Sequence, residues 1–95
     1  MVPVNKKKKV DYEALKSPFM RIPRMDVETA RDLIDLGFRE CYELYGCSAE
    51  VLFTDLSRKK GNIPRERLYK FRLAIYYSEN EEIDGKKLDL TYWMY

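Results

Sequence analysis

Residues 22–37 read Ile-Pro-Arg-Met-Asp-Val-Glu-Thr-Ala-Arg-Asp-Leu-Ile-Asp-Leu-Gly, and this stretch decides the fold. From Val27 onward, apolar residues recur at the spacing of an α-helix. Asp26 stands where a helix N-cap belongs, and Gly37 stands where a left-handed residue ends a helix. The stretch therefore predicts a turn followed by a helix over residues 27–36.

Helix signals recur on both sides of this stretch. Ser17 followed by Pro18 is a pattern of helix starts, and it predicts a short helical segment over residues 18–22. A second short helix is predicted over residues 39–45, where Gly46 stops it.

Two longer helices are predicted in the second half of the chain. Ser48 is the N-cap of a helix that Gly61 ends, and the basic residues 58–60 suit the negative end of its dipole. Pro64 opens a further helix that runs to about Ser78. The apolar stripes predicted to face the core are Ala49, Leu52, Phe53 and Leu56 on the first of these helices, and Leu68, Phe71, Ala74 and Ile75 on the second.

The chain closes with aromatic residues, Tyr92-Trp93-Met94-Tyr95, after an Asp84-Gly85 turn. Such apolar surface is expected to pack back onto the domain. Ninety-five residues, 45% of them hydrophobic, make one domain. The sequence thus predicts an all-α, compact single domain of four to five helices over residues 11–95, preceded by a disordered basic arm at residues 1–10.

Composition argues against an enzyme. The chain contains no His, the side chain most used as a general base, and no Gly-rich phosphate loop. Asp32 with Asp35 and Glu81 with Glu82 are carboxylate pairs, but all four lie in charge-rich stretches and are expected on the surface. The prediction is a non-catalytic protein without a cofactor or a small-molecule substrate.

The cysteines and the N-terminal residues indicate a cytoplasmic protein. Cys41 and Cys47 are six positions apart, a spacing typical of neither a redox motif nor a zinc site. Two reduced thiols are expected, with a disulfide as the alternative, and no metal is expected. No apolar run follows Lys6 to Lys9 as a signal peptide requires, and no stretch approaches the ~20 apolar residues of a membrane span.

Residues 22–37 resemble a helix-hairpin-helix motif, whose pattern runs roughly Ile-Pro-Gly-Ile-Gly-x-x-x-Ala-x-x-Leu. Residues 68–77 and the aromatic segment around Trp93 resemble the corresponding parts of a small bacterial family described as pathogenicity locus or mitomycin resistance proteins. The resemblance covers about residues 15–95. It implies a helix-hairpin-helix domain, of SAM-like type, with DNA-binding ancestry and no established catalytic activity.

Arg24 and Asp26 stand where the hairpin pattern has its two glycines, with Met25 between them. In a working hairpin the glycines let the turn tighten, so that backbone N–H groups face a phosphate. A carboxylate at Asp26 satisfies those groups itself and repels a phosphate by ~4 kcal/mol at ~4 Å and an effective dielectric of ~20. Arg24, Met25 and Asp26 are therefore predicted to form a structural hairpin.

Charge is distributed unevenly along the chain. Residues 26–55 contain eight acidic and two basic side chains, whereas residues 58–72 contain seven basic and one acidic. The basic segment lies at the second helix–turn–helix junction, where turn N–H groups and tyrosine rings could bind phosphates and stack on bases. The residues predicted to bind nucleic acid are Arg58, Lys59, Lys60, Gly61, Asn62, Arg65, Tyr69, Arg72 and Tyr76.

Two readings of the basic segment remain open. It could bind a DNA or RNA backbone weakly, with little sequence preference and a steep salt dependence. It could instead pair with the acidic segment across the domain, with tyrosine rings packed beside arginine. The alternative function is an adaptor that has lost DNA binding, since the first hairpin lacks both glycines, and that contacts a protein partner or a second copy. The eight tyrosines and Trp93 are typical of interface centres.

Overall fold

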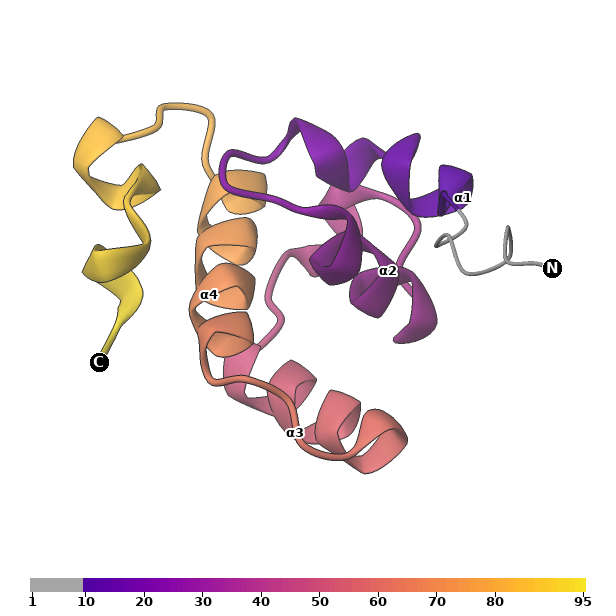
Figure 1. Cartoon of the computed structure of the whole chain (residues 1–95). Helices are drawn as coiled ribbons and strands as arrows, with labels where there is room; N and C mark the ends of the chain where they lie inside the picture. The colour runs from indigo at the N-terminus through magenta and orange to yellow at the C-terminus, as the bar shows by residue number, and fades with distance from the viewer. Residues whose placement is uncertain (1–9) are drawn as a thin grey trace, which may run out of the picture.

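The order of elements follows the helix signals of the sequence. A computed structural model describes residues 10–95 and contains the α-helices α1 (Tyr12–Leu15), α2 (Val27–Asp35), α3 (Ala49–Lys60) and α4 (Glu66–Glu79) (Figure 1). Short 3-10 helices lie between and after them: η2 (Pro18–Arg21), η3 (Cys41–Leu44), η4 (Gly85–Leu88) and η5 (Leu90–Trp93). Within the described residues there is no β-strand, and the predicted all-α class is confirmed.

Helix α2 begins and ends where its sequence predicts. The backbone N–H of Thr29 donates to the Asp26 side chain at 2.9 Å, which caps the first turn. At the other end Leu36 is the C-cap, and Gly37 follows with a φ of +104°. A glycine reaches this left-handed region without the steric cost of a Cβ. The predicted end at Leu36 is therefore right to within one residue.

Helices α3 and α4 supply much of the core. Ser48 caps α3 by accepting a hydrogen bond from the Val51 N–H, and Gly61 ends the helix with a φ of +87°. The buried apolar residues on these helices include Ala49, Leu52, Leu56, Leu68, Phe71, Ala74 and Ile75, all members of the predicted stripes. Phe53 packs against them and is half-buried.

The structure differs from the prediction near the N-terminus. Residues 12–15 form α1, which was not predicted and which Asp11 caps by accepting from the Ala14 N–H at 3.1 Å. Ser17 does not cap η2, because its hydroxyl instead donates to the Ala14 carbonyl at 2.7 Å. The helix predicted over residues 39–45 is the single 3-10 turn η3, which is too short for an α-helical stripe.

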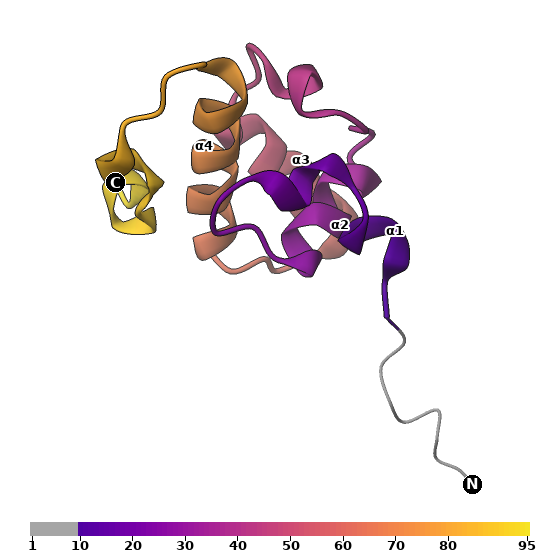
Figure 2. The same cartoon turned by 90° about the horizontal axis from the view of Figure 1, so that it is seen from above.

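The aromatic residues at the C-terminal end of the sequence contact α4, as predicted. Residues 84–95, which we call the strap, lie along the face of α4 that points away from α2 and α3 (Figures 1 and 2). None of the strap's residues is buried. Most of the predicted basic arm lies outside the described residues, and its remaining member, Val10, is exposed. In the described part of the chain, no helix has the length and apolar character needed to cross a bilayer.

Candidate nucleic-acid interface

The first hairpin connects η2 to α2 through Arg24, which has a φ of +66°. This is the left-handed conformation that a glycine adopts readily and a long side chain adopts rarely. The Met25 N–H donates to the Ile22 carbonyl at 3.2 Å and closes the turn. The chain is thus bent tightly at Arg24, and Asp26 enters α2 as its cap.

The carboxylate of Asp26 is bound on both oxygens at the start of α2. One oxygen accepts from the Thr29 N–H, and the other receives Lys70 Nζ of α4 at 2.7 Å. Burial opposes the ionisation of Asp26, but the hydrogen bonds from Lys70 and Thr29 outweigh it and lower its pKa to about 2. The hairpin residues Arg24, Met25 and Asp26 are therefore closed by an ionised acid of the chain itself.

The second bend, between α3 and α4, has no such acid at its centre. Gly61 N–H donates to the Ser57 carbonyl at 2.8 Å and completes the end of α3. The backbone N–H groups of Asn62, Ile63 and Arg65 make no hydrogen bond within residues 10–95. These three donors precede the first turn of α4, at the positive end of its dipole.

Three exposed cations surround this bend. Arg58 has a side chain that is 77% exposed, and its nearest carboxylate oxygen, on Asp55, is 3.7 Å away. Lys59 and Arg65 are exposed and form no ion pair among the described residues. An exposed pair such as Arg58–Asp55 contributes about 0.5 kcal/mol at most and leaves the guanidinium free to bind elsewhere.

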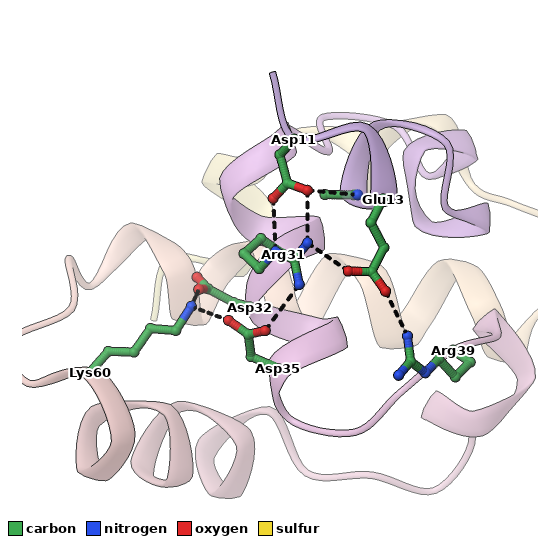
Figure 3. Close-up of polar contacts among 8 residues, drawn as sticks. Asp11, Glu13, Arg31, Asp32, Asp35, Arg39 and Lys60 are labelled. Carbon is green, nitrogen blue, oxygen red and sulfur yellow. Dashed lines mark hydrogen bonds and ion pairs between the residues drawn. The ribbon is translucent and has the colours of Figure 1, made fainter. Parts of the chain in front are cut away.

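Other cations of the basic segment are already bound by the acidic segment. Lys60 Nζ lies 2.6 Å from Asp32 and 2.7 Å from Asp35 (Figure 3), and Arg67 also pairs with Asp32. Lys70 pairs with Asp26, as described above. The reading in which the two segments pair across the domain is therefore correct for these residues, and Lys60 does not join the open cations.

Asp32 differs from its prediction as a surface carboxylate. It is only 4% exposed, because Lys60 and Arg67 cover it from α3 and α4. Lys60 and Arg67 lie far from Asp32 in the sequence, so the spacing within α2 gave no signal of this burial.

The same helix carries a second cluster of charges, centred on Arg31 (Figure 3). Its guanidinium donates to Asp11 at 2.7 Å, to Glu13 at 2.8 Å and to Asp35 at 3.2 Å. The hydrogen bond from Arg31 lowers the pKa of Asp11 to about 2. This cluster ties α1 to α2 and consumes a cation that could otherwise attract a polyanion.

The predicted arginine and tyrosine stripe on α4 is wrong as an open surface. Arg72 is only 8% exposed and donates to Glu50 at 2.8 Å and to the Trp93 carbonyl at 2.6 Å. The Tyr76 ring lies 5.5 Å from the Trp93 ring, centroid to centroid, and Tyr69 is half-buried against the core. For Arg72 and Tyr76 the reason is the strap, because Trp93 contacts both residues and Tyr95 contacts Arg72.

The two cysteines are free and half-buried. Burial raises the pKa of both thiols, so neither Cys41 nor Cys47 is activated as a thiolate. No group of three or more metal-ligating side chains lies together among residues 10–95.

The class of protein is therefore a compact all-α domain, in which an acid closes the turn before α2 and exposed cations lie at the bend between α3 and α4. The particular family follows from comparison with known families. The chain belongs to the Cdd1 pathogenicity locus family, whose model matches residues 12–95. No curated protein and no solved structure matched the chain.

Proposed function

We propose that this protein is a non-catalytic helix-hairpin-helix domain that binds a nucleic-acid backbone weakly through the bend between α3 and α4. The observation that carries the proposal is the contrast between its two bends. Asp26 closes the first, whereas the second has three N–H groups without a partner in the described residues, in a segment that also carries the exposed side chains of Arg58, Lys59 and Arg65. Cations and convergent N–H groups are the chemistry that holds phosphate.

Support for the helix-hairpin-helix type comes from the backbone of Arg24. Its positive φ falls at the position where the motif has its first glycine. A non-glycine residue is rarely held in this conformation unless the surrounding structure requires it. This φ is the value expected if the turn keeps the conformation of the motif after losing its first glycine.

Binding through this bend should be weak and indifferent to sequence. Three cations that neutralise phosphates predict a slope of log K against log salt of about −2 to −3. The bend offers no side chain placed for paired contacts with a base edge, so A·T and G·C sites should bind alike.

Fluorescence anisotropy tests the proposal with labelled single- and double-stranded DNA at two salt concentrations. The double variant Arg58→Glu/Arg65→Glu should weaken binding at least tenfold at low salt, because it replaces two attractive charges by repulsive ones. Its control is Lys16→Glu/Arg21→Glu, which has the same net charge but changes residues that follow α1 and end η2, outside the bend between α3 and α4. Equal loss in both variants would show general charge attraction and refute the bend as a site.

A second candidate function is an adaptor for another protein or a second copy of this chain. It is favoured by exposed aromatic side chains around η3, where Tyr42 is 65% and Tyr45 is 58% exposed. Tyrosine at such exposure is typical of interface centres. Size-exclusion chromatography with light scattering tests it: a dimer that Tyr42→Ala/Tyr45→Ala converts to a monomer would favour this function over the first.

A further inference from the structure

The strap meets α4 chiefly through two side chains, Arg72 and Tyr76, which lie one turn apart. Arg72 Nη1 donates to the carbonyls of Trp93 at 2.6 Å and Tyr95 at 3.0 Å, and its guanidinium carbon lies 3.9 Å above the Tyr95 ring. The Tyr76 ring packs against Trp93, and its hydroxyl accepts from the Asp84 N–H at 2.8 Å. Two backbone acceptors and two rings thus occupy this face of α4.

The strap buries little of its own side-chain surface against α4. None of residues 84–95 is buried, and none belongs to the hydrophobic core cluster. Segments with few buried apolar contacts open at a lower free energy than the core does. The strap can therefore leave α4 while the core stays folded, and its departure would uncover Arg72 and Tyr76.

The hydrogen bonding of Arg72 is incomplete beneath the strap. Its Nε is buried and has no partner among the described residues. Its Nη1 is bound by the backbone oxygens of Trp93 and Tyr95, and its Nη2 is bound by Glu50, whose side chain is 61% exposed. A phosphate supplies several charged oxygens in a geometry that matches a guanidinium, and such bonds are stronger than those to carbonyls. Glu50 is free to swing into solvent when a phosphate replaces it.

A cavity of about 280 Å³ lies beside Arg72, between the strap, the start of α3 and α4. Tyr76, Trp93 and Tyr95 line it together with Arg72, and so do Glu79 and Glu50, which pairs with Arg72 at 2.8 Å. Once the strap has left, the Tyr76 ring, on which a base can stack, lies next to an arginine that can bind the backbone, and this is the common chemistry of single-strand binding sites.

We propose that the face of α4 beneath the strap is a second nucleic-acid site, specific for single strands, and that the strap closes it. Trp93 and Tyr95 occupy the positions where two unpaired bases would stack on Tyr76 and Arg72. Duplex is excluded because its bases are already stacked on one another. This inference rests on the proposed function and deepens it: the bend makes the first contact, and release of the strap extends the contact along α4.

The test measures binding of the full chain to a short labelled oligothymidylate by anisotropy. Trp93→Ala removes the ring that packs on Tyr76 and should tighten binding roughly tenfold, with no gain for duplex of the same length. Tyr95→Ala, which frees the face of Arg72, should act in the same direction. Tyr12→Ala is the matched control, since this exposed tyrosine lies on α1 and not on the strap. Adding Arg72→Gln to Trp93→Ala should cancel the gain, and circular dichroism verifies that each variant keeps its helices.

The outcomes separate this inference from the proposed function. If the intact chain binds through the bend but Trp93→Ala and Tyr95→Ala bind no more tightly, the closed site is refuted and the bend stands. If Trp93→Ala binds and the intact chain does not, the closed site is supported and the bend is refuted. If neither the intact chain nor any variant binds, both the closed site on α4 and the site at the bend are refuted. A gain that persists after Arg72→Gln also overturns the assignment to α4.

Discussion

Asp26 has two tasks at the scale of single residues. It caps α2 through the Thr29 N–H, and it holds Lys70 of α4 by an ion pair. Asparagine can perform the first task but not the second, because its amide carries no charge. Substitutions at this position therefore separate the hydrogen bond of the cap from the ion pair with Lys70.

We expect Asp26→Ala to lower the free energy of unfolding by about 1–2 kcal/mol, and Asp26→Asn by less than half as much. Urea unfolding measures both values. A drop of the same size in the two variants would mean that the charge, and not the cap, is what stabilises this turn. Asp26→Asn should also admit phosphate to the first hairpin and raise the affinity for DNA at low salt.

The lowered pKa of Asp26 predicts a pH dependence of stability. Its pKa is about 2 in the folded chain against an ordinary value of 3.8. The unfolded state therefore binds more protons in this range, so stability is fully present above pH 4 and is lost as the pH falls toward 2. Thermal unfolding between pH 5 and pH 2 should show a smaller loss for Asp26→Asn than for the intact chain.

Glycine is required at position 61 by the backbone conformation and not by a lack of room for a side chain. Its φ is +87°, and nothing lies within 4 Å of the position of an added Cβ. Gly61→Ala should cost about 1–3 kcal/mol of unfolding free energy, because an L-residue is strained in this conformation. Gly85→Ala is the control: Gly85 has equal space and no positive φ, so it should change stability by less than about 0.5 kcal/mol.

At the scale of elements, α3 has one side in the core and one in solvent. Leu56 is fully buried, whereas Val51 is 55% exposed. Leu56→Ala should lower the free energy of unfolding by about 2–4 kcal/mol, because it removes buried methyl groups and leaves a cavity. Val51→Ala should change it by less than about 0.5 kcal/mol. Urea denaturation of both variants checks the orientation of α3, and similar losses would show that the helix is turned differently.

Helix α4 is the element on which sequence and structure differ most. Its predicted core stripe is buried, as expected, but Arg72 and Leu73 are buried as well. A helix packed by the core on one side and by the strap on the other has little surface left for solvent. Amphipathic spacing alone identifies one buried side of such a helix, and the second depends on where the strap folds.

At the scale of the whole molecule, ion pairs join segments that lie far apart in the sequence. Asp32 on α2 receives Lys60 from the end of α3 and Arg67 from α4. Removing a partner of a buried carboxylate is costly, since the remaining charge loses part of its compensation. Ion pairs that are exposed to solvent contribute far less to the free energy of unfolding.

We therefore expect Arg67→Met to lower the free energy of unfolding by about 2–3 kcal/mol. Arg39→Met, which breaks an exposed pair with Glu13, should lower it by less than about 0.5 kcal/mol. Chemical denaturation at low and high salt measures both. If the two variants lose equal stability, the network around Asp32 is no more than surface charge.

The local signals of the sequence were reliable wherever one residue decides a conformation. Asp26 and Ser48 cap their helices, and Gly37 and Gly61 end theirs, because hydrogen bonds to the next turn and left-handed φ values depend on neighbours only. The closed first hairpin followed from the same reasoning. The cap expected at Ser17 was wrong because α1, a single turn with little apolar pattern, offered a competing carbonyl.

The sequence by itself therefore determined the all-α class, the ends of the longer helices, the acid in the first hairpin and the excess of cations near the second bend. Only the tertiary structure decided which of those cations stay open. Arg58, Lys59 and Arg65 face solvent, while Lys60, Arg67 and Lys70 meet acids of α2 and its cap, and Arg72 lies beneath the strap. The physical reason is that helix caps are settled within one turn of chain, whereas the pairing of charges and the cover of a helix face depend on segments that meet only when the chain has folded.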